Sequence, residues 1–289
     1  MKIAIASGKG GTGKTFVSTN LFKAFKDLGY STILVDADVE CPNSLLFYKL
    51  KKVDETIVKE YRPIIHSDKC VYCGLCADYC EYNAIFYVPE LKQIKLLPNL
   101  CHGCKACSVA CQYGAIEDSN TEIGIVSSYI DKDKNLYFEG RLKEGSVSTI
   151  PMIKSTISQA SKQLSDFILI DSPPGTSCPF IQTSIRSDFV ILVTEPTPYG
   201  LSDLRQAILT LDSMNKSYGV IINRAGLGNM ELYDYLLENN IQILGEIPFS
   251  KEIARMYTQG DLVYDTMEDM NLLYRELCKK IINYGNSLS

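Results

Sequence analysis

The chain has 289 residues, 46% of them hydrophobic and 22% charged, which is enough for one large α/β domain and a small module. Its formal net charge of −5 leaves no basic excess for phosphates, so a dedicated nucleic-acid binder is excluded. No apolar run approaches the roughly 20 residues that span a bilayer, and the N-terminal residues do not have the layout of a signal peptide. We therefore predict a cytoplasmic protein without membrane attachment, in which the 11 cysteines are metal ligands rather than disulfide partners.

The first motif in the chain is the loop Gly8–Thr15, which reads GKGGTGKT and matches the P-loop pattern G-x-x-x-x-G-K-[ST]. An apolar run, Ile3–Ala6, precedes it, and a helical pattern over Thr15–Leu28 follows it. Glycines let backbone N–H groups approach phosphate oxygens, while Lys14 adds a positive charge and Thr15 offers a hydroxyl to Mg²⁺. The loop therefore predicts a nucleoside triphosphate site, and the alternative is a glycine-rich turn without a ligand.

Lys9 is a second lysine inside this loop, and with it the motif KGGTGKT resembles the deviant P-loop of the MinD/ParA/Mrp and nitrogenase iron protein class. The resemblance implies a doubly wound, mostly parallel α/β sheet, ATP and Mg²⁺ as ligands, and ATPase activity. It also implies an ATP-dependent homodimer, or a heterodimer with a related ATPase, in which Lys9 reaches the partner's nucleotide and stabilises the transition state in trans. The alternative for Lys9 is a solvated loop lysine.

A short apolar strand, Ser31–Val35, leads to Asp36 and Asp38, at the edge where doubly wound sheets place ligand groups. The resemblance assigns Asp38 to switch I, where it meets the Mg²⁺ shell and orients the attacking water. The alternative is an aspartate that caps a turn.

A second apolar strand, Phe167–Ile170, ends in DSPPGTSCP, which resembles switch II of the Mrp-type branch. The resemblance makes Asp171 the Walker B carboxylate that binds Mg²⁺ through water, and it makes Gly175 an N–H donor to the γ-phosphate. Cys178 follows at an offset similar to that of a bridging-cluster cysteine in the nitrogenase iron protein, so a cluster shared by two chains is a further hypothesis.

The two switch segments are separated by a stretch of a different character, which begins at about Tyr61. It contains the run C-x2-C-x2-C-x3-C twice, with similar tails CEYNAIFY and CQYGAIED. This spacing is typical of bacterial ferredoxins with two [4Fe-4S] clusters, in which the fourth cysteine of each run binds the other cluster. The predicted ligands are Cys70, Cys73, Cys76 and Cys111 for cluster I, and Cys101, Cys104, Cys107 and Cys80 for cluster II. Zinc bound by four thiolates is the alternative.

These motifs define two domains. Residues 1–60 and 119–289 form the MinD-like ATPase domain, and residues 61–118 form the inserted ferredoxin-like domain. Beyond the insert we expect an edge hairpin from Glu122–Tyr129 and Leu136–Leu142, followed by a helix over Met152–Leu164. The C-terminal segment Met267–Tyr284 reads as an amphipathic helix whose apolar residues pack on the sheet, namely Leu272, Leu273, Leu277 and Ile281.

The remaining nucleotide contacts rest on the resemblance. The strand Tyr218–Ile222 ends in Asn223-Arg224, and the class uses this asparagine to bind adenine; the alternative is a strand-end turn. Pro248 begins a segment like the one that lines adenine in this class, although Ser250 replaces its usual acidic residue. The expected catalytic residues are Lys9, Lys14, Asp38 and Asp171. The expected nucleotide-binding set is Gly8, Gly10, Gly11, Thr12, Gly13, Lys14, Thr15, Phe16, Gly175, Asn223, Arg224 and Pro248.

Three functions are compatible with these motifs. The first is an ATPase whose nucleotide cycle gates electron transfer through the two clusters to a redox partner, and low-potential clusters favour it. The second is an ATPase that assembles or carries iron–sulfur clusters or another metallocofactor. The third is a ParA-like positioning ATPase in which the clusters only brace the structure. We expect the first.

Overall fold

In the computed structural model, which describes residues 1–287, the chain forms two compact units. Unit 1 comprises Met1–Glu55, Val126–Arg141 and the chain from Ile153 onward, and unit 2 comprises Thr56–Ile125 and Leu142–Met152. The strands β3 (Lys51–Ile65) and β6 (Ile116–Ile130) therefore have residues in both units. These limits lie near the predicted 61–118 boundaries, while the segment that returns to unit 2 after β6 carries no sequence signal of its own.

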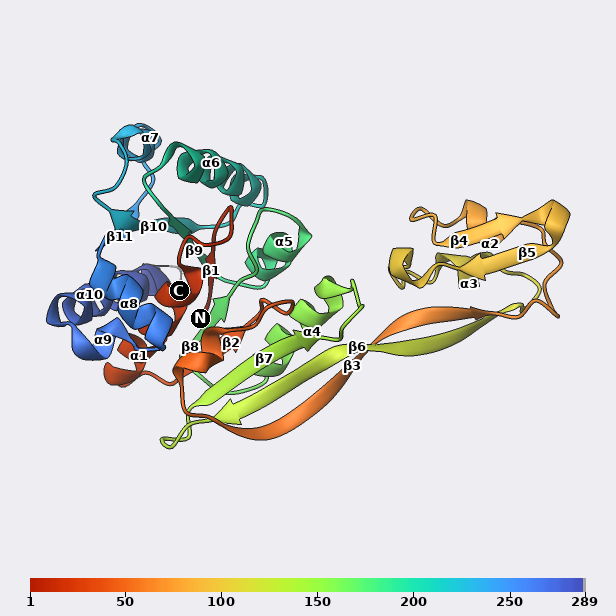
Figure 1. The fold of residues 1–289 in the computed structure, drawn as a ribbon, viewed down its shortest axis with the longest axis horizontal. Helices are drawn as coiled ribbons and strands as arrows, with labels where there is room; N and C mark the ends of the chain where they lie inside the picture. Colours follow the sequence, from red (N-terminus) through yellow and green to blue (C-terminus); the bar gives the residue numbers. More distant parts are fainter. Residues whose placement is uncertain (288–289) are drawn as a thin grey trace. The chain divides into compact units, whose positions relative to one another are not determined.

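A nine-stranded sheet organises unit 1, and its strand order is β11-β10-β9-β1-β8-β2-β7-β6-β3 (Figure 1). The strands that pair in parallel are β1 (Lys2–Ala6), β2 (Thr32–Asp36), β7 (Leu136–Leu142), β8 (Phe167–Asp171), β9 (Phe189–Thr194), β10 (Tyr218–Ala225) and β11 (Ile243–Pro248). Most of them are short apolar runs that are buried throughout, as strands covered on both faces are. The predicted α/β class with a mostly parallel sheet is confirmed.

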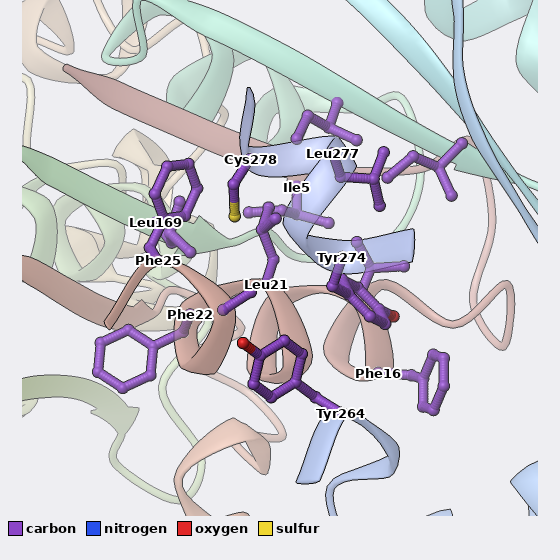
Figure 2. Packing of buried hydrophobic residues seen from close by; sticks show 14 of the residues in the cluster. Ile5, Phe16, Leu21, Phe22, Phe25, Leu169, Tyr264, Tyr274, Leu277 and Cys278 are labelled. Atoms are coloured by element: carbon purple, nitrogen blue, oxygen red, sulfur yellow. The ribbon is translucent and has the colours of Figure 1, made fainter. Parts of the chain in front are cut away.

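Alternate residues of β1, β9 and β10 face two separate hydrophobic cores. In β1, Ile3 and Ile5 belong to one core while Ala4 and Ala6 belong to the other, as the two-residue period of a strand requires. The first core, shown in Figure 2, packs against α1 (Lys14–Asp27), α8 (Lys251–Gln259), α9 (Val263–Thr266) and α10 (Glu268–Ser287). The second packs against α5 (Cys178–Ile185), α6 (Pro198–Ser213) and α7 (Glu231–Glu238).

Two expectations about the periphery of unit 1 are wrong. The hairpin β6–β7 is not at the edge of the sheet, because β7 pairs with β2 and β3 covers the other side of β6. The sequence of β3, KKVDETIVKEYRPII, is rich in charged residues and lacks a sustained apolar run, so this strand was not predicted. The following helix, α4, spans Thr149–Ala160 and so starts and ends before the predicted Met152–Leu164.

The C-terminal helix α10 lies against the first core, as predicted, through Leu277 and Ile281, which are buried, and Leu273, which is partly buried. Leu272 is an exception: its side chain is 56% exposed, because it falls on the outer face of the helix. Cys278 is fully buried in the same core. No helix among residues 1–287 is both long and apolar enough to cross a membrane.

In unit 2 the sequence repeat is also a structural repeat. The helices α2 (Leu75–Asp78) and α3 (Ala106–Ala110) each begin after a residue with left-handed backbone that directly follows the second cysteine of its run, Gly74 and Lys105. The two tails make equivalent hydrogen bonds: the Ala84 carbonyl accepts from the Leu97 N–H, and the Ala115 carbonyl accepts from the His66 N–H. One antiparallel pair, β4 (Ile85–Val88) with β5 (Gln93–Leu96), completes the unit together with short 3₁₀ turns.

Candidate functional site

The P-loop lies between β1 and α1, and two of its glycines are fixed by close contacts. Gly13 directly precedes α1 with φ 99°, and a Cβ there would stand 2.3 Å from Nδ2 of Asn223. A Cβ at Gly8 would stand 2.3 Å from the main-chain oxygen of Asp203. Both positions therefore require glycine. The loop leads directly into the N-terminal end of α1, which carries the positive end of the helix dipole and suits an anion.

Lys14 is the buried cation of this loop, with only 8% of its surface exposed. Burial lowers the pKa of Lys14, and the nearby carboxylates of Asp171 and Asp38 oppose that shift. Two buried hydroxyls close to the motifs, those of Thr12 and Ser172, have no hydrogen-bond partner among residues 1–287. Buried polar groups are normally satisfied in proteins. A ligand that carries hydrogen-bond acceptors and negative charge fits these residues.

Two buried carboxylates stand opposite each other on neighbouring strands, Asp36 on β2 and Asp171 on β8. Burial and the charge of Asp36 raise the pKa of Asp171 to about 8, although hydrogen bonds from the hydroxyls of Thr15 and Ser18 lower it in part. The Ser18 Oγ donates to Asp171 Oδ1 at 3.1 Å. Thr15 also hydrogen-bonds Asp171, so a hydroxyl and a carboxylate, oxygen donors of the kind that Mg²⁺ prefers, lie side by side here.

Asp36 has a different role from the one predicted for Asp38. Its Oδ2 accepts from the N–H of Asn43, the N–H of Ser44 and the hydroxyl of Ser44, each at 2.8 Å. Burial nevertheless raises its pKa to about 6. Asp36 therefore holds the loop after β2 in place, and burial also raises the pKa of Asp38, which remains near Lys14.

Two other predicted residues, Asn223 and Gly175, hydrogen-bond to the main chain of the P-loop and of the residue before it. Asn223 Nδ2 donates to the Thr12 carbonyl at 2.8 Å, and the Gly175 N–H donates to the Ser7 carbonyl at 3.2 Å. Both groups thus brace the loop, and their predicted contacts with adenine and the γ-phosphate stay predictions.

Two residues of the expected nucleotide-binding set, Phe16 and Pro248, have structural roles in the fold. The side chain of Phe16 is buried in the core, with its ring centroid 5.9 Å from that of Tyr257, so only its main chain can face a nucleotide. Pro248 ends β11 and pairs with Ala225 of β10. Ser250, which replaces the usual acidic residue, caps α8 by accepting from the N–H groups of Glu252 and Ile253.

Sequence reasoning missed one residue of the site, Glu195. Its Oε1 is 2.6 Å from Lys9 Nζ, and its Oε2 is 2.6 Å from Arg224 Nη1. Arg224 also donates through Nη2 to the Gly11 carbonyl at 3.1 Å. Glu195 directly follows β9, and the end of a parallel strand next to β1 is a place where ligand groups gather, so its position was a usable signal.

The eight motif cysteines of unit 2 divide between two small cavities. One cavity is lined by Cys70, Cys73, Cys76 and Cys111, and the other by Cys80, Cys101, Cys104 and Cys107. In both sets one cysteine is exposed (Cys73, Cys104), one is buried (Cys76, Cys107), and the other two are intermediate. The fourth cysteine of each run therefore lines the cavity of the other run. Among residues 1–287, no three Cys, His, Asp or Glu side chains are arranged to hold a single metal ion.

Comparison with known proteins bears on the nucleotide site first. Residues 3–263 match the family model described as the CobQ/CobB/MinD/ParA nucleotide binding domain. An uncharacterized protein of Methanocaldococcus jannaschii is 32% identical over 283 residues, which cover 97% of this chain and 96% of that protein. An iron-sulfur cluster carrier protein of Pyrococcus furiosus is 25% identical over 251 residues, covering 85% and 67%. The MinD cell division protein of Aquifex aeolicus shares the fold, with a TM-score of 0.59 at 20% identity over 98% of this chain and 96% of that one.

Proposed function

Because the chain belongs to the CobQ/CobB/MinD/ParA nucleotide-binding family, it is a P-loop ATPase, and we propose that its ATP cycle drives the assembly or delivery of iron–sulfur clusters held by unit 2. The similarity to an iron-sulfur cluster carrier protein supports this function. The cysteine spacing alone favoured electron transfer, but none of the relatives described above is named for it. Assembly or delivery is therefore the better supported of the two.

In this proposal the nucleotide site uses the residues that its motifs predict. Lys14 binds the β- and γ-phosphates, and the Thr15 hydroxyl and the Asp171 carboxylate hold Mg²⁺. Magnesium, when bound, neutralises charge on the transferred phosphate. Asp38 orients the attacking water, and Lys9 acts on the nucleotide of a second chain in an ATP-dependent dimer, formed either with a copy or with a related ATPase. The buried Lys14 charge between two carboxylates supports these roles.

The division of the cysteines between two cavities is the observation that carries the cluster proposal. Each cavity offers four thiol groups, the donor set of a [4Fe-4S] cluster, and the two sets are those that the interleaved ferredoxin spacing predicts. In such a cluster each thiolate binds a different iron, so the four sulfur atoms surround the cluster. The two cavities are similar in size, as two equivalent sites would be. Zinc remains the alternative, and iron and sulfide analysis separates the two.

Delivery requires that a cluster leaves by exchange of its thiolate ligands. The exposed cysteine of each set, Cys73 or Cys104, is where a thiolate of an acceptor protein can replace a ligand of this chain. The bond from iron to the leaving cysteine breaks as the bond to the incoming thiolate forms, and no electron is transferred. The buried cysteines Cys76 and Cys107 would be the last ligands to exchange.

The decisive experiment is anaerobic transfer. The reconstituted protein is mixed with an apo-protein that needs a [4Fe-4S] cluster, with and without Mg-ATP, and the activity of the acceptor is followed. We expect faster transfer with ATP and no acceleration by ATP in Lys14→Ala. Equal rates with and without ATP in the unmodified protein would contradict an ATP-driven carrier.

Electron transfer is the second candidate, and the presence of two cavities within one small unit favours it, because paired clusters suit stepwise electron flow. It predicts that the midpoint potentials of the clusters shift when ATP binds and that no cluster reaches the acceptor. A redox titration followed by electron paramagnetic resonance, with and without nucleotide, distinguishes it from delivery.

A further inference from the structure

The carboxylate of Glu195 lies between two cations of the nucleotide site. Each oxygen serves one of them, with Oε1 at 2.6 Å from Lys9 and Oε2 at 2.6 Å from Arg224. The Glu195 side chain is only 11% exposed, whereas the side chains of Lys9 and Arg224 are 30% and 45% exposed. The two cations are therefore the parts of this bridge that solvent and a ligand can reach.

The main chain at Glu195 is fixed on several sides. A Cβ at Gly200 would stand 2.2 Å from the Glu195 carbonyl oxygen, and a Cβ at Gly228 would stand 1.6 Å from that of Pro196. The Glu195 carbonyl also accepts from the Thr197 N–H at 2.8 Å. Because two neighbouring segments touch this stretch so closely, the main chain that carries the carboxylate is held in place.

The same cations hold the tip of the P-loop. Lys9 belongs to the loop itself, and its carbonyl accepts from the Ser7 hydroxyl at 2.5 Å. Arg224 donates to the carbonyl of Gly11 and has a left-handed backbone at φ 55°. An uncommon backbone conformation at a non-glycine residue persists where the surroundings impose it. Residues 9–11 are thus tied to Glu195 directly and through Arg224.

A nucleotide brings several negative charges to this loop and offers the same two cations better partners. We propose that Glu195 is a positioning residue that acts as an internal counter-anion: without nucleotide it holds Lys9 and Arg224, and the phosphates of ATP compete with it for them. Binding of ATP then releases Lys9 from Glu195, which deepens the proposed function, since Lys9 must leave Glu195 before it can reach the nucleotide of a second chain. The inference rests on the nucleotide site of that proposed function.

Competition by Glu195 predicts a gain of affinity when its charge is removed. Glu195→Gln keeps the shape of the side chain and weakens two charge-assisted hydrogen bonds, so we expect ATP to bind about tenfold more tightly, measured by calorimetry with a non-hydrolysable analogue. Glu238→Gln, which removes one charge from an exposed position at the end of α7, is the matched control and should leave affinity unchanged. Unchanged or weaker binding in Glu195→Gln would overturn the proposal.

Two further readouts separate a counter-anion from a merely structural residue. In the Lys9→Ala background the gain from Glu195→Gln should shrink to about threefold, because one of the two competing contacts is already gone. Amide hydrogen exchange at residues 9–11 should be faster in nucleotide-free Glu195→Gln than in the unmodified chain, while Glu195→Asp should restore part of the protection. Equal exchange rates would contradict the bridge, and failure of the unmodified protein to bind ATP at all would instead contradict the proposed function.

Discussion

The nucleotide site of unit 1 and the cysteine cavities of unit 2 are stabilised in different ways. The first core beside the P-loop contains many large buried side chains, including Phe22, Phe25 and Tyr274. The cluster around the cysteines has three buried members, Cys76, Ile85 and Cys107, and two of these are predicted ligands. Burial of apolar area stabilises by roughly 25 cal/mol per Å², so unit 1 has its own source of stability. Unit 2 has little buried apolar area of this kind, so the clusters that we propose for its cysteines would be its main source of stability.

The two sites also differ in how well their polar groups are hydrogen-bonded in the absence of a ligand. Around the P-loop, Asn223, Arg224 and Glu195 already hold one another and the loop by hydrogen bonds. In unit 2 the buried thiol of Cys76 has other cysteines as its nearest titratable groups, and burial raises its pKa to about 11. The nucleotide site is therefore held by side-chain hydrogen bonds before a ligand binds, whereas we propose that unit 2 is stabilised mainly by its clusters.

The largest test of this difference is Cys76→Ser. Loss of a buried ligand should remove one cluster, so that iron falls from about eight to about four per chain, and should expose residues 66–115 to proteolysis. ATP affinity, measured by calorimetry, should not change. Cys41→Ser removes an exposed cysteine outside both sets and serves as the control. A full complement of iron in Cys76→Ser would contradict the ligand assignment.

Lys14→Ala provides the reverse test. We expect ATP affinity to fall by at least about a hundredfold, because a buried ammonium group loses its hydrogen bonds to two phosphates, each worth about 1.5–3 kcal/mol. The iron content should stay constant, since the cysteines lie in the other unit. Lys26→Ala, at the opposite end of the same helix, is the control. Normal ATP affinity in Lys14→Ala would remove the P-loop assignment.

A smaller effect concerns the buried carboxylates. The pKa of Asp171 rises from 3.8 to about 8 on folding, so the folded state holds its proton more tightly than the unfolded chain. Its contribution to the free energy of unfolding is therefore complete below about pH 4 and is lost as pH rises to about 8. Without Mg²⁺, the thermal midpoint of unit 1 should fall across this range. Asp171→Asn should flatten the profile and raise stability at pH 8 by about 2 kcal/mol. An unaltered pH profile in Asp171→Asn would show that another group titrates.

Sequence patterns predicted the centre of unit 1 well because its signals are local. Apolar runs of five or six residues become buried strands, and the loop between β1 and α1 follows from its glycines and lysines. The strand β3 could not be predicted in this way, because it lies at the sheet edge and seven of its first residues, Lys51–Ile57, are exposed. An edge strand needs no apolar pattern when its neighbour supplies the hydrogen bonds.

The residues of the site divide in a similar manner. Lys14, Asp38 and Asp171 belong to contiguous motifs, and the structure brings them together. Glu195 is different, because its partners Lys9 and Arg224 are far from it in sequence. The segment that contains Glu195, EPTPYG at residues 195–200, does not itself indicate that this carboxylate pairs with Lys9 and Arg224. The pairing of β9 with β1 on one side and with β10 on the other brings these charges together.

The smallest effect is expected at Ser250, where the family pattern and the structure point to different roles. In this chain Ser250 caps α8, and replacing such a cap costs about 1 kcal/mol. Ser250→Ala should therefore lower the free energy of unfolding of unit 1 by about that amount and leave ATP affinity within a factor of about two. Ser250→Asp keeps a capping oxygen and should retain stability. If Ser250→Asp instead altered the preference for ATP over GTP, the side chain at position 250 would face the base of the nucleotide. Its role as the cap of α8 would then not be its only role in unit 1.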